Sequence, residues 1–238
     1  MGYLAENAVF MPLTKTILEE SDKFTCGNED LDDFFQNDSI AYAEDLFGKT
    51  YCFQMKENVK ELLCAFTVSN ASIFTMLLPN ARKKKVAKNV SYVKRDLIYP
   101  AVLIGRLGIS TRYQQHHIGT ELMNFIKSWF VDSSNKTGCR YLIVDAYNSD
   151  IPLAFYKKNG FDFIFSTEEQ EKDYRKIVSN EPLRTRLMFF DLIFIKPHLL
   201  ALTTNCQGHN YQYKNYLIRI KSKNIRRVRR GSSDTILR

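Results

Sequence analysis

The sequence has little of the features that would indicate a disulfide framework, a metal-binding module or a membrane span. Its five cysteines stand singly, without the paired spacing of a zinc knuckle or a disulfide-rich domain. The longest strongly apolar run, Leu187 to Ile195, contains Asp191 and is far too short to cross a bilayer. The first residues lack the basic flank and the apolar stretch of a signal peptide. We therefore expect a soluble cytoplasmic protein with no membrane contact and no bound metal.

The net charge of +8 comes from one end of the chain. Residues 199–238 hold nine basic residues and one acidic residue, whereas the preceding part holds 25 of each kind. Tyr211, Tyr213 and Tyr216 lie among these basic residues. Such a tail could bind RNA phosphates and stack on bases. The alternatives are a disordered extension or translated non-native sequence.

The order of apolar patterns predicts a mixed α/β protein whose sheet is flanked by helices. With 238 residues, of which 45% are hydrophobic, the chain can bury a sizeable core. We expect a main domain over residues 1–197 and a basic tail over 198–238, because Pro197 ends the last strand-like run. Strands are expected at 14–18, 50–55, 61–73, 103–109, 138–147, 161–165 and 186–195.

Capping residues predict where several helices begin and end. Asn28 is a suitable N-cap for a short helix through Phe35, and Gly48 is a suitable residue to close a second helix over 39–46. A later helix would have Pro152 in its first turn and would be closed by Gly160. Charged residues 168–178 also favour a helix.

One stretch, Leu103 to Phe130, combines a strand-like run, a polar turn and a helix beginning near Ile118. The first turn of a helix has unpaired N–H groups and the positive end of the helix dipole, so it suits a phosphate or pyrophosphate. An ordinary strand-to-helix connection would show the same pattern. A basic segment upstream has the same ambiguity, since it could be a solvated surface or a surface for an anionic substrate. Its residues are Arg82, Lys83, Lys84, Lys85, Lys88, Lys94 and Arg95.

Two motifs together resemble the GCN5-related N-acetyltransferases, the GNAT superfamily. The family pattern Gln/Arg-x-x-Gly-x-Gly/Ala lies over Gln114-Gln-His-His-Ile-Gly119, and Ala154-Phe-Tyr-Lys-Lys-Asn-Gly-Phe161 matches the family's second half. The signature Phe24-Thr-Cys-Gly-Asn-Glu-Asp-Leu-Asp-Asp-Phe34, with Gly105-Arg-Leu-Gly-Ile109, is similar to the branch that includes aminoacyl-tRNA-acetylating toxins of toxin-antitoxin systems. The resemblance covers residues 12–196.

One position departs from the family pattern. His117 stands where the motif has its first glycine, which lets the backbone approach a pyrophosphate closely. A backbone near the helical region would keep the N–H donors in place with any L-residue, so we expect binding to survive.

The resemblance implies a mostly antiparallel sheet of about six or seven strands, acetyl-CoA as the cofactor, and transfer of its acetyl group to a primary amine. It implies that backbone groups of Leu107, Gly108 and Ile109 pair with the pantetheine arm, and that Asn148 lies beside it. It further implies a pyrophosphate site in the turn and first helical residues. These residues are Gln114, Gln115, His116, His117, Ile118, Gly119 and Thr120.

Tyr156 matches the family's general acid. A phenol with a pKa near 10 stays protonated at neutral pH and lies about 1.5 units above a typical thiol, so it can donate a proton to the departing thiolate. The alternative is a core aromatic residue between Phe155 and Phe161.

No general base can be named from the sequence. This fits an α-amine acceptor such as aminoacyl-tRNA, because an α-amine has a pKa of about 7.7 to 8 whereas a lysine is near 10.4. The alternatives are a small amine, a polyamine, a protein N-terminus, or a catalytically impaired CoA- or RNA-binding module. By the same resemblance, an antitoxin protein and a second copy in a homodimer are expected partners.

Overall fold

The structure is a computed structural model that describes residues 2–90, 98–114, 116–132, 135 and 137–195. Residues 1–195 form one compact unit. The predictions for Lys94, Arg95, Gln115 and the basic tail lie outside the described residues.

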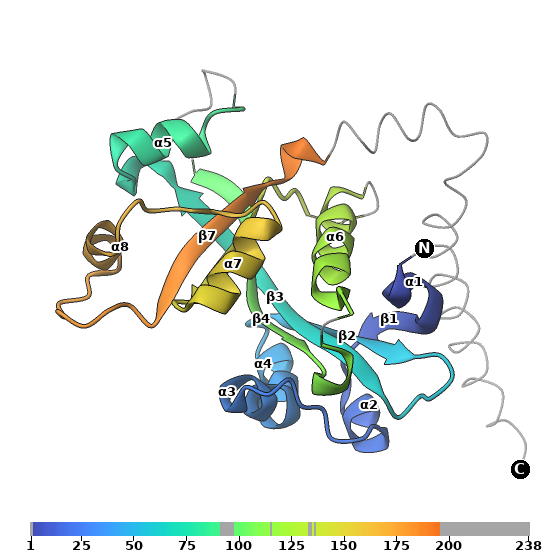
Figure 1. Ribbon diagram of the computed structural model, residues 1–238. Helices are drawn as coiled ribbons and strands as arrows, with labels where there is room; N and C mark the ends of the chain where they lie inside the picture. The colour runs from blue at the N-terminus through green and yellow to red at the C-terminus, as the bar shows by residue number, and fades with distance from the viewer. Residues whose placement is uncertain (1, 91–97, 115, 133–134, 136, 196–238) are drawn as a thin grey trace, which may run out of the picture. The chain divides into compact units, whose positions relative to one another are not determined.

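Seven strands form one sheet in the order β1-β2-β3-β4-β5-β7-β6 (Figure 1). Every neighbouring pair is antiparallel except β4 and β5, which run parallel. The sequence therefore predicted both the mixed class and the antiparallel character of the sheet. The strands are β1 (Ala8–Pro12), β2 (Lys49–Met55), β3 (Leu62–Phe74), β4 (Ile98–Ile109), β5 (Tyr141–Tyr147), β6 (Asp162–Phe163) and β7 (Thr185–Asp191).

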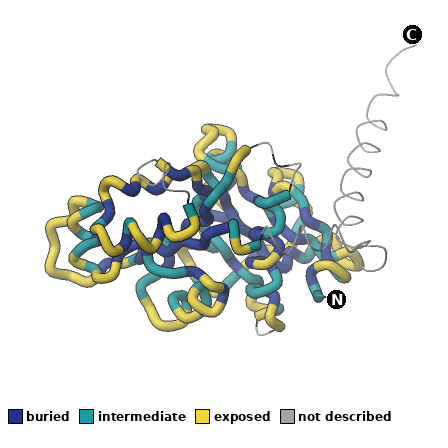
Figure 2. Tube along the Cα trace, turned by 90° about the horizontal axis from the view of Figure 1, so that it is seen from above, coloured by how far each residue is buried: buried dark blue, intermediate teal, exposed yellow. Residues whose placement is uncertain are grey.

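Helices cover both faces of the sheet (Figure 1). One face, here called the α6 face, carries α6 (Ile118–Val131), α7 (Asp150–Lys158) and the short α1 (Tyr3–Asn7). The other, here called the α8 face, carries α2 (Lys15–Glu20), α3 (Glu29–Asp33), α4 (Ser39–Glu44), α5 (Asn80–Val86) and α8 (Glu168–Arg175). Buried residues are concentrated in the strands between these two layers (Figure 2).

Aromatic side chains fix the position of α6 on its face. The ring of Phe125 lies 5.0 Å from that of Phe53 on β2, and Trp129 lies 5.1 Å from Phe10 on β1. Phe10 is also 6.1 Å from Phe66 on β3. Because such aromatic pairs combine a large buried area with a preferred ring geometry, they fix the position of α6 over β1, β2 and β3.

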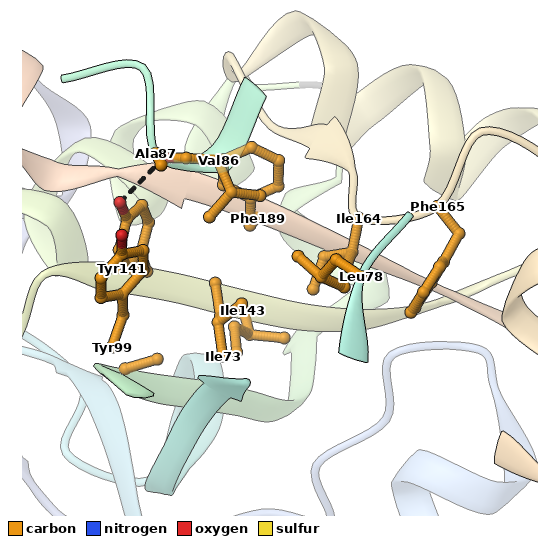
Figure 3. Close-up of a cluster of buried hydrophobic side chains, with 11 residues drawn as sticks. Ile73, Leu78, Val86, Ala87, Tyr99, Tyr141, Ile143, Ile164, Phe165 and Phe189 are labelled. Atoms are coloured by element: carbon orange, nitrogen blue, oxygen red, sulfur yellow. Dashed lines mark hydrogen bonds between the residues drawn. The ribbon is translucent and has the colours of Figure 1, made fainter. Parts of the chain in front are cut away.

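On the α8 face, an apolar cluster connects α5 to the middle of the sheet (Figure 3). Ile73, Ile143 and Phe189 come from three strands, and Val86 comes from α5. The hydroxyl of Tyr141 donates to the carbonyl of Val86 at 2.9 Å, which satisfies a polar group within the cluster (Figure 3). The cluster packs α5 against the strands β4 and β5.

Several predicted boundaries are confirmed. Asn28 caps α3, accepting a hydrogen bond from the Leu31 amide at 3.1 Å. Pro152 lies in the first turn of α7, and Gly160 follows this helix with a φ of +80°.

Other predicted boundaries are wrong. Residues 14–18 were predicted as a strand, but Thr14 is the N-cap of α2 and residues 15–18 lie in this helix. The Thr14 side chain accepts from the Ile17 amide, which favours the start of a helix here. The left-handed residue after α4 is Leu46, with a φ of 62°, rather than Gly48. The first strand of the sheet is β1, which was not predicted from the sequence.

A buried carboxylate joins α8 to the edge of the sheet. Glu171, whose side chain is 0% exposed, accepts from Arg186 at 2.8 Å, from Arg175 at 2.6 Å and from the backbone amide of Leu187 at 2.7 Å. Arg186 is itself buried. Each charge in this group therefore depends on its partners for compensation.

We predict that Glu171→Gln lowers the free energy of unfolding by about 3 kcal/mol, because Arg186 is left as a buried cation without a full counter-charge. Urea unfolding measures the change. Glu181→Gln, at an exposed site before β7, serves as the control and should unfold at the wild-type midpoint. Equal midpoints for both variants would contradict the assignment.

Candidate functional site

The central strands β4 and β5 separate before they end. Their pairing runs from Ala101 with Tyr141 to Ile104 with Val144. Beyond that point β4 continues to Ile109 and β5 to Tyr147 without a shared register. The sheet therefore has an opening between residues 105–109 and residues 145–147.

A β-bulge lies where the two strands separate. Thr67 of β3 pairs with Arg106 and the next residue, Val68, pairs with Ile104, so Gly105 is the extra residue on β4. A bulge bends its strand and increases the local twist, which turns the end of β4 away from β5. Since backbone groups alternate in direction along a strand, about half of those in residues 105–109 face the opening. Among the described residues, no strand pairs with them on that side.

The first turn of α6 follows the end of β4 and has free backbone donors. No side chain caps this helix, and the first amide with an acceptor in the turn is that of Glu121, which donates to the His117 carbonyl at 3.1 Å. The amides of Ile118, Gly119 and Thr120 have no acceptor within the described part of the chain. The carboxylate of Glu121 accepts instead from the Ala5 amide of α1, at 3.2 Å. This arrangement leaves unpaired N–H donors at the positive end of the helix dipole, and the binding of an anion there stays a prediction.

The prediction for the backbone of His117 needs correction. The residue caps α6 with φ 57° and ψ 11°, which is the left-handed region and not the right-handed helical region. This conformation favours glycine and costs an L-residue about 1 kcal/mol. The family's glycine at this position thus has a conformational reason, and the histidine adopts the same turn with strain. Its side chain is exposed, as is that of His116.

Two glycines of the predicted site are required by packing. A Cβ on Gly119 would lie 2.9 Å from the ring of Phe155, so the absence of a side chain lets α6 and α7 approach. A Cβ on Gly108 would lie 3.0 Å from Cys26 and 3.1 Å from Phe35. Because Gly119 has no side chain, α6, which carries the end of the first motif, packs closely against α7, which carries the second. Gly108 likewise leaves room for the segment before α3 to cross β4.

The polar residues of the turn mainly support its shape. The side-chain amide of Gln114 donates to the Cys26 carbonyl at 2.8 Å and to the Ile109 carbonyl at 3.2 Å. The His116 ring stacks on Tyr3 of α1 with centroids 6.4 Å apart. Gln115 lies outside the described residues.

Tyr156 lies on α7 among aromatic rings. Its ring centroid is 5.1 Å from that of Phe155 and 5.5 Å from that of Phe161. Burial raises the pKa of its hydroxyl above the ordinary value of 10.0. By its accessible surface the residue is only half-buried, so its hydroxyl is not enclosed by the protein.

A buried lysine that the sequence did not single out joins α6 to the end of α7. Lys127 Nζ donates to the Asn159 carbonyl at 2.5 Å and lies 4.1 Å from the ring centroid of Phe190. The residue is 5% exposed, and this burial lowers the pKa of its ammonium group to about 8. The helices α6 and α7 thus contact each other at two places along α6, near Gly119 and near Lys127.

Asn148 follows β5, at the edge of the opening. Its side-chain amide donates to Glu168 at 2.9 Å and to the Leu183 carbonyl at 2.8 Å, which ties it to α8 and to the chain before β7. Its predicted place beside the pantetheine arm stays a prediction.

Two charged residues that sequence reasoning missed border the opening on the α8 face. Asp145 is the first residue of β5 after the paired segment, and it forms an ion pair with Arg175 of α8 at 2.7 Å. Arg106 follows the bulge on β4, and its guanidinium lies 3.8 Å from the ring centroid of Phe34. The signal for Asp145 was a single carboxylate within the apolar run Leu-Ile-Val-Asp-Ala.

Comparison with known proteins identifies the fold. No family model matches the chain, and no curated protein does. Solved structures do match, among them AtaT complexed with acetyl-methionyl-tRNAfMet, with a TM-score of 0.55 and 20% identity over 81% of this chain and 99% of that one. A tyrosine-to-phenylalanine mutant of KacT matches with a TM-score of 0.55 and 19% identity, over 81% and 99% of the two chains. The chain has the fold of AtaT and KacT.

A third structure adds a ligand to the comparison. It is an AtaT mutant toxin bound to acetyl-CoA and to the C-terminus of the antitoxin AtaR, and it matches with a TM-score of 0.52 and 18% identity over 82% of this chain and 99% of that one. The fold predicted from the GNAT resemblance is confirmed. Among the described residues, no helix is long and apolar enough to cross a membrane.

We predict that Gly119→Ala lowers the free energy of unfolding by about 1 to 3 kcal/mol, because the added methyl group overpacks the contact with Phe155. Thermal and urea unfolding measure the change. Gly138→Ala is the matched control, since a Cβ there meets nothing within 4 Å. Equal losses in the two variants would show that the α6–α7 contact is not close.

We also predict a pH-dependent difference between the wild type and Lys127→Met. The folded-state pKa of about 8 lies below the unfolded value of 10.5, so the unfolded chain binds more protons between these limits and the lysine's contribution to stability increases as pH rises. The free energy of unfolding of the wild type should therefore gain about 2 kcal/mol relative to the variant between pH 8 and pH 10. Tyrosine and cysteine titrations are common to both proteins and cancel. A difference that stays flat with pH would refute the low pKa.

Proposed function

We propose that this protein is an acetyl-CoA-dependent N-acetyltransferase. The observation that carries the proposal is the opening between β4 and β5, which has unpaired backbone groups on β4 and is followed by the uncapped N-terminus of α6. Tyr156 lies on α7, which packs against α6 on the same face of the sheet. The fold is shared with an AtaT toxin whose structure contains acetyl-CoA. A strand edge, a helix N-terminus and a proton donor are the three parts that such a transfer requires.

Acetyl-CoA fits the residues present at this opening. The exposed edge of residues 107–109 suits the amide groups of a pantetheine arm, because an extended chain with amides can pair with an unpaired strand. The free amides of Ile118, Gly119 and Thr120 suit a pyrophosphate. When bound, acetyl-CoA supplies an acetyl group activated as a thioester.

Tyr156 would protonate the departing sulfur. A phenol with an ordinary pKa near 10 is protonated at neutral pH, so it can donate its proton as negative charge develops on the sulfur. The raised pKa of Tyr156 keeps the phenol in the acid form over a wide pH range. Several of the matching structures are tyrosine-to-phenylalanine mutants of KacT and AtaT.

Backbone donors of β4 would stabilise the negative charge that develops on the acetyl oxygen. These donors are fixed by the pairing of residues 106–109 with β3, so they need no reorganisation during the reaction. The bulge at Gly105 directs them into the opening rather than toward β5.

We propose the α-amine of aminoacyl-tRNA as the acceptor. An α-amine is partly neutral at physiological pH and needs little help from a base. AtaT, which shares the fold, has been solved in complex with acetyl-methionyl-tRNAfMet. An antitoxin protein is the corresponding partner, since the AtaT toxin was solved with the C-terminus of AtaR.

A catalytically impaired CoA- or RNA-binding module is the second candidate, and His117 is the residue that favours it. Its left-handed backbone gives the same turn as a glycine would, so the helix end remains available to an anion. Turnover of acetyl-CoA with an amine acceptor separates the two candidates.

We predict that Tyr156→Phe lowers kcat at least about 100-fold, because the change removes the proton and keeps the ring packing. Steady-state acetylation of purified aminoacyl-tRNA measures the loss, and thermal unfolding confirms that the variant folds. Tyr51→Phe, which removes a tyrosine hydroxyl from β2, is the matched control and should retain the wild-type kcat. A wild-type kcat in Tyr156→Phe with every amine tested would exclude Tyr156 as the acid.

Expression in cells tests the substrate. Growth arrest that Tyr156→Phe relieves, together with labelled acetate on tRNA detected by mass spectrometry, would support aminoacyl-tRNA. Labelled acetate on small amines or protein N-termini, with normal growth, would identify another acceptor.

A further inference from the structure

The opening between β4 and β5 has two sides, and the groups described above lie on one of them. The helices α6 and α7, which carry the uncapped helix end and Tyr156, both lie on the α6 face (Figure 1). Side chains on the two faces alternate along each strand. The α8 face of the same opening is therefore lined by a different set of residues.

An apolar cavity of about 190 Å³ lies on the α8 face at the last paired positions of β4 and β5. This is about six times the ~30 Å³ that one water occupies in the liquid, which leaves room for a side chain of several carbon atoms. Figure 3 shows Ile73, Leu78, Ile143 and Ile164 around this part of the face. Its lining includes Ala71, Leu103, Ile143, Ile164, Tyr174 and Leu187.

Asp145 lies at the margin of this cavity. It is two residues beyond Ile143 on the same face of β5, and it is the cross-strand partner of Leu187. Residues directly opposite on antiparallel strands have Cβ atoms about 5 Å apart. The carboxylate is thus close to two residues of the cavity wall, at the point where β5 leaves β4.

Arg175 holds the Asp145 carboxylate in place without using all of its capacity. The guanidinium contacts the two carboxylate oxygens at 2.7 and 3.3 Å, and it also contacts Glu171 at 2.6 Å. An ionised carboxylate has about four lone-pair positions, so a bidentate arginine leaves two of them for a further donor. The Asp145 side chain is 34% exposed, so these positions can be reached from outside.

We propose that the α8 face of the opening is the acceptor site, in which Asp145 binds the attacking amine and the adjacent cavity receives an apolar side chain. A carboxylate beside an apolar cavity is the complement of an α-amino group next to an apolar side chain. The proposal rests on the proposed function and narrows its substrate to aminoacyl groups such as methionyl, leucyl, isoleucyl or valyl.

In the proposed acetyl transfer, the amine nitrogen forms a bond to the acetyl carbonyl carbon and the bond from that carbon to sulfur breaks. The amine proton passes to Asp145. The leaving sulfur takes the proton of the Tyr156 hydroxyl from the α6 face. Water then carries a proton from Asp145 to Tyr156, which restores both residues.

The test measures kcat and KM of the full-length protein with acetyl-CoA and a set of aminoacylated tRNAs. Asp145→Ala should lower kcat/KM at least about 100-fold, Asp145→Glu should retain part of the activity, and added formate should restore part of the rate of Asp145→Ala. Asp162→Asn is the matched control, because Asp162 is also a partly exposed, ion-paired aspartate but lies on β6. It should retain wild-type kinetics.

A further variant separates chemistry from structure. Arg175→Met removes the ion pair and keeps the carboxylate. It should lower the melting temperature, and it should lower kcat less than Asp145→Ala does. Equal loss of kcat in Arg175→Met and Asp145→Ala, without rescue by formate, would reduce Asp145 to a structural role and overturn the proposal. Full activity of a folded Asp145→Ala would overturn it as well.

Acceptor preference tests the cavity in the same assay. The wild type should favour tRNAs that carry apolar residues over those that carry glycine or aspartate, and Ala71→Leu should reduce this preference by filling the cavity. Ala41→Leu, at an exposed site on α4, is the control. If the wild type acetylates no aminoacyl-tRNA, the proposed substrate fails, and methioninamide and glycinamide then serve as acceptors for the Asp145 and Ala71 variants. If the protein acetylates these acceptors without preferring apolar residues, the assignment of the cavity is wrong and the role of Asp145 is unaffected.

Discussion

The separation of β4 from β5 after Ile104 and Val144 is the constraint on which the rest of the structure depends. A sheet is stabilised by continuous pairing, and interrupting it between two central strands leaves backbone groups without partners. The bulge at Gly105 makes the interruption local, because β4 remains paired with β3 through Ile109. The chain thus keeps a seven-stranded sheet while one edge of β4 stays available for a ligand.

Such an opening needs support from outside the sheet, and α6 and α7 provide it on one face. The rings of Phe125 and Trp129 fix α6 on β1 to β3, on one side of the opening. Close contact at Gly119 and the hydrogen bond from Lys127 then fix α7 relative to α6. The placement of Tyr156 therefore depends on packing in the opposite half of the sheet. A buried lysine is a costly way to make such a connection, but it also satisfies a carbonyl at the C-terminal end of α7.

The sequence predicted those parts of the site that depend on local patterns. The turn before α6, the capping of α3 by Asn28 and the closing of α7 at Gly160 follow from short-range chemistry, and the structure confirms them. The opening itself was not predicted from the residues of the strand. Gly105 and Gly108 within Leu103 to Ile109 are a weak signal for a bulge, but only the pairing with β3 shows that Gly105 is the extra residue. Lys127 and Asp145 were missed for a related reason. Each is one polar residue in an apolar element, and only the tertiary structure shows what it contacts.

An acyl transfer to an amine needs a proton donor for the leaving group and a proton acceptor for the nucleophile, on different sides of the carbonyl carbon. A continuous sheet would allow both groups only on the same face or at its edge. Because β4 and β5 separate, Tyr156 can act from the α6 face while Asp145 can act from the α8 face. The environments differ accordingly, since the phenol is surrounded by aromatic rings and the carboxylate is held by Arg175. Burial among aromatic rings raises the pKa of Tyr156 and keeps its phenol protonated, while the carboxylate of Asp145 is accessible from the other side of the opening.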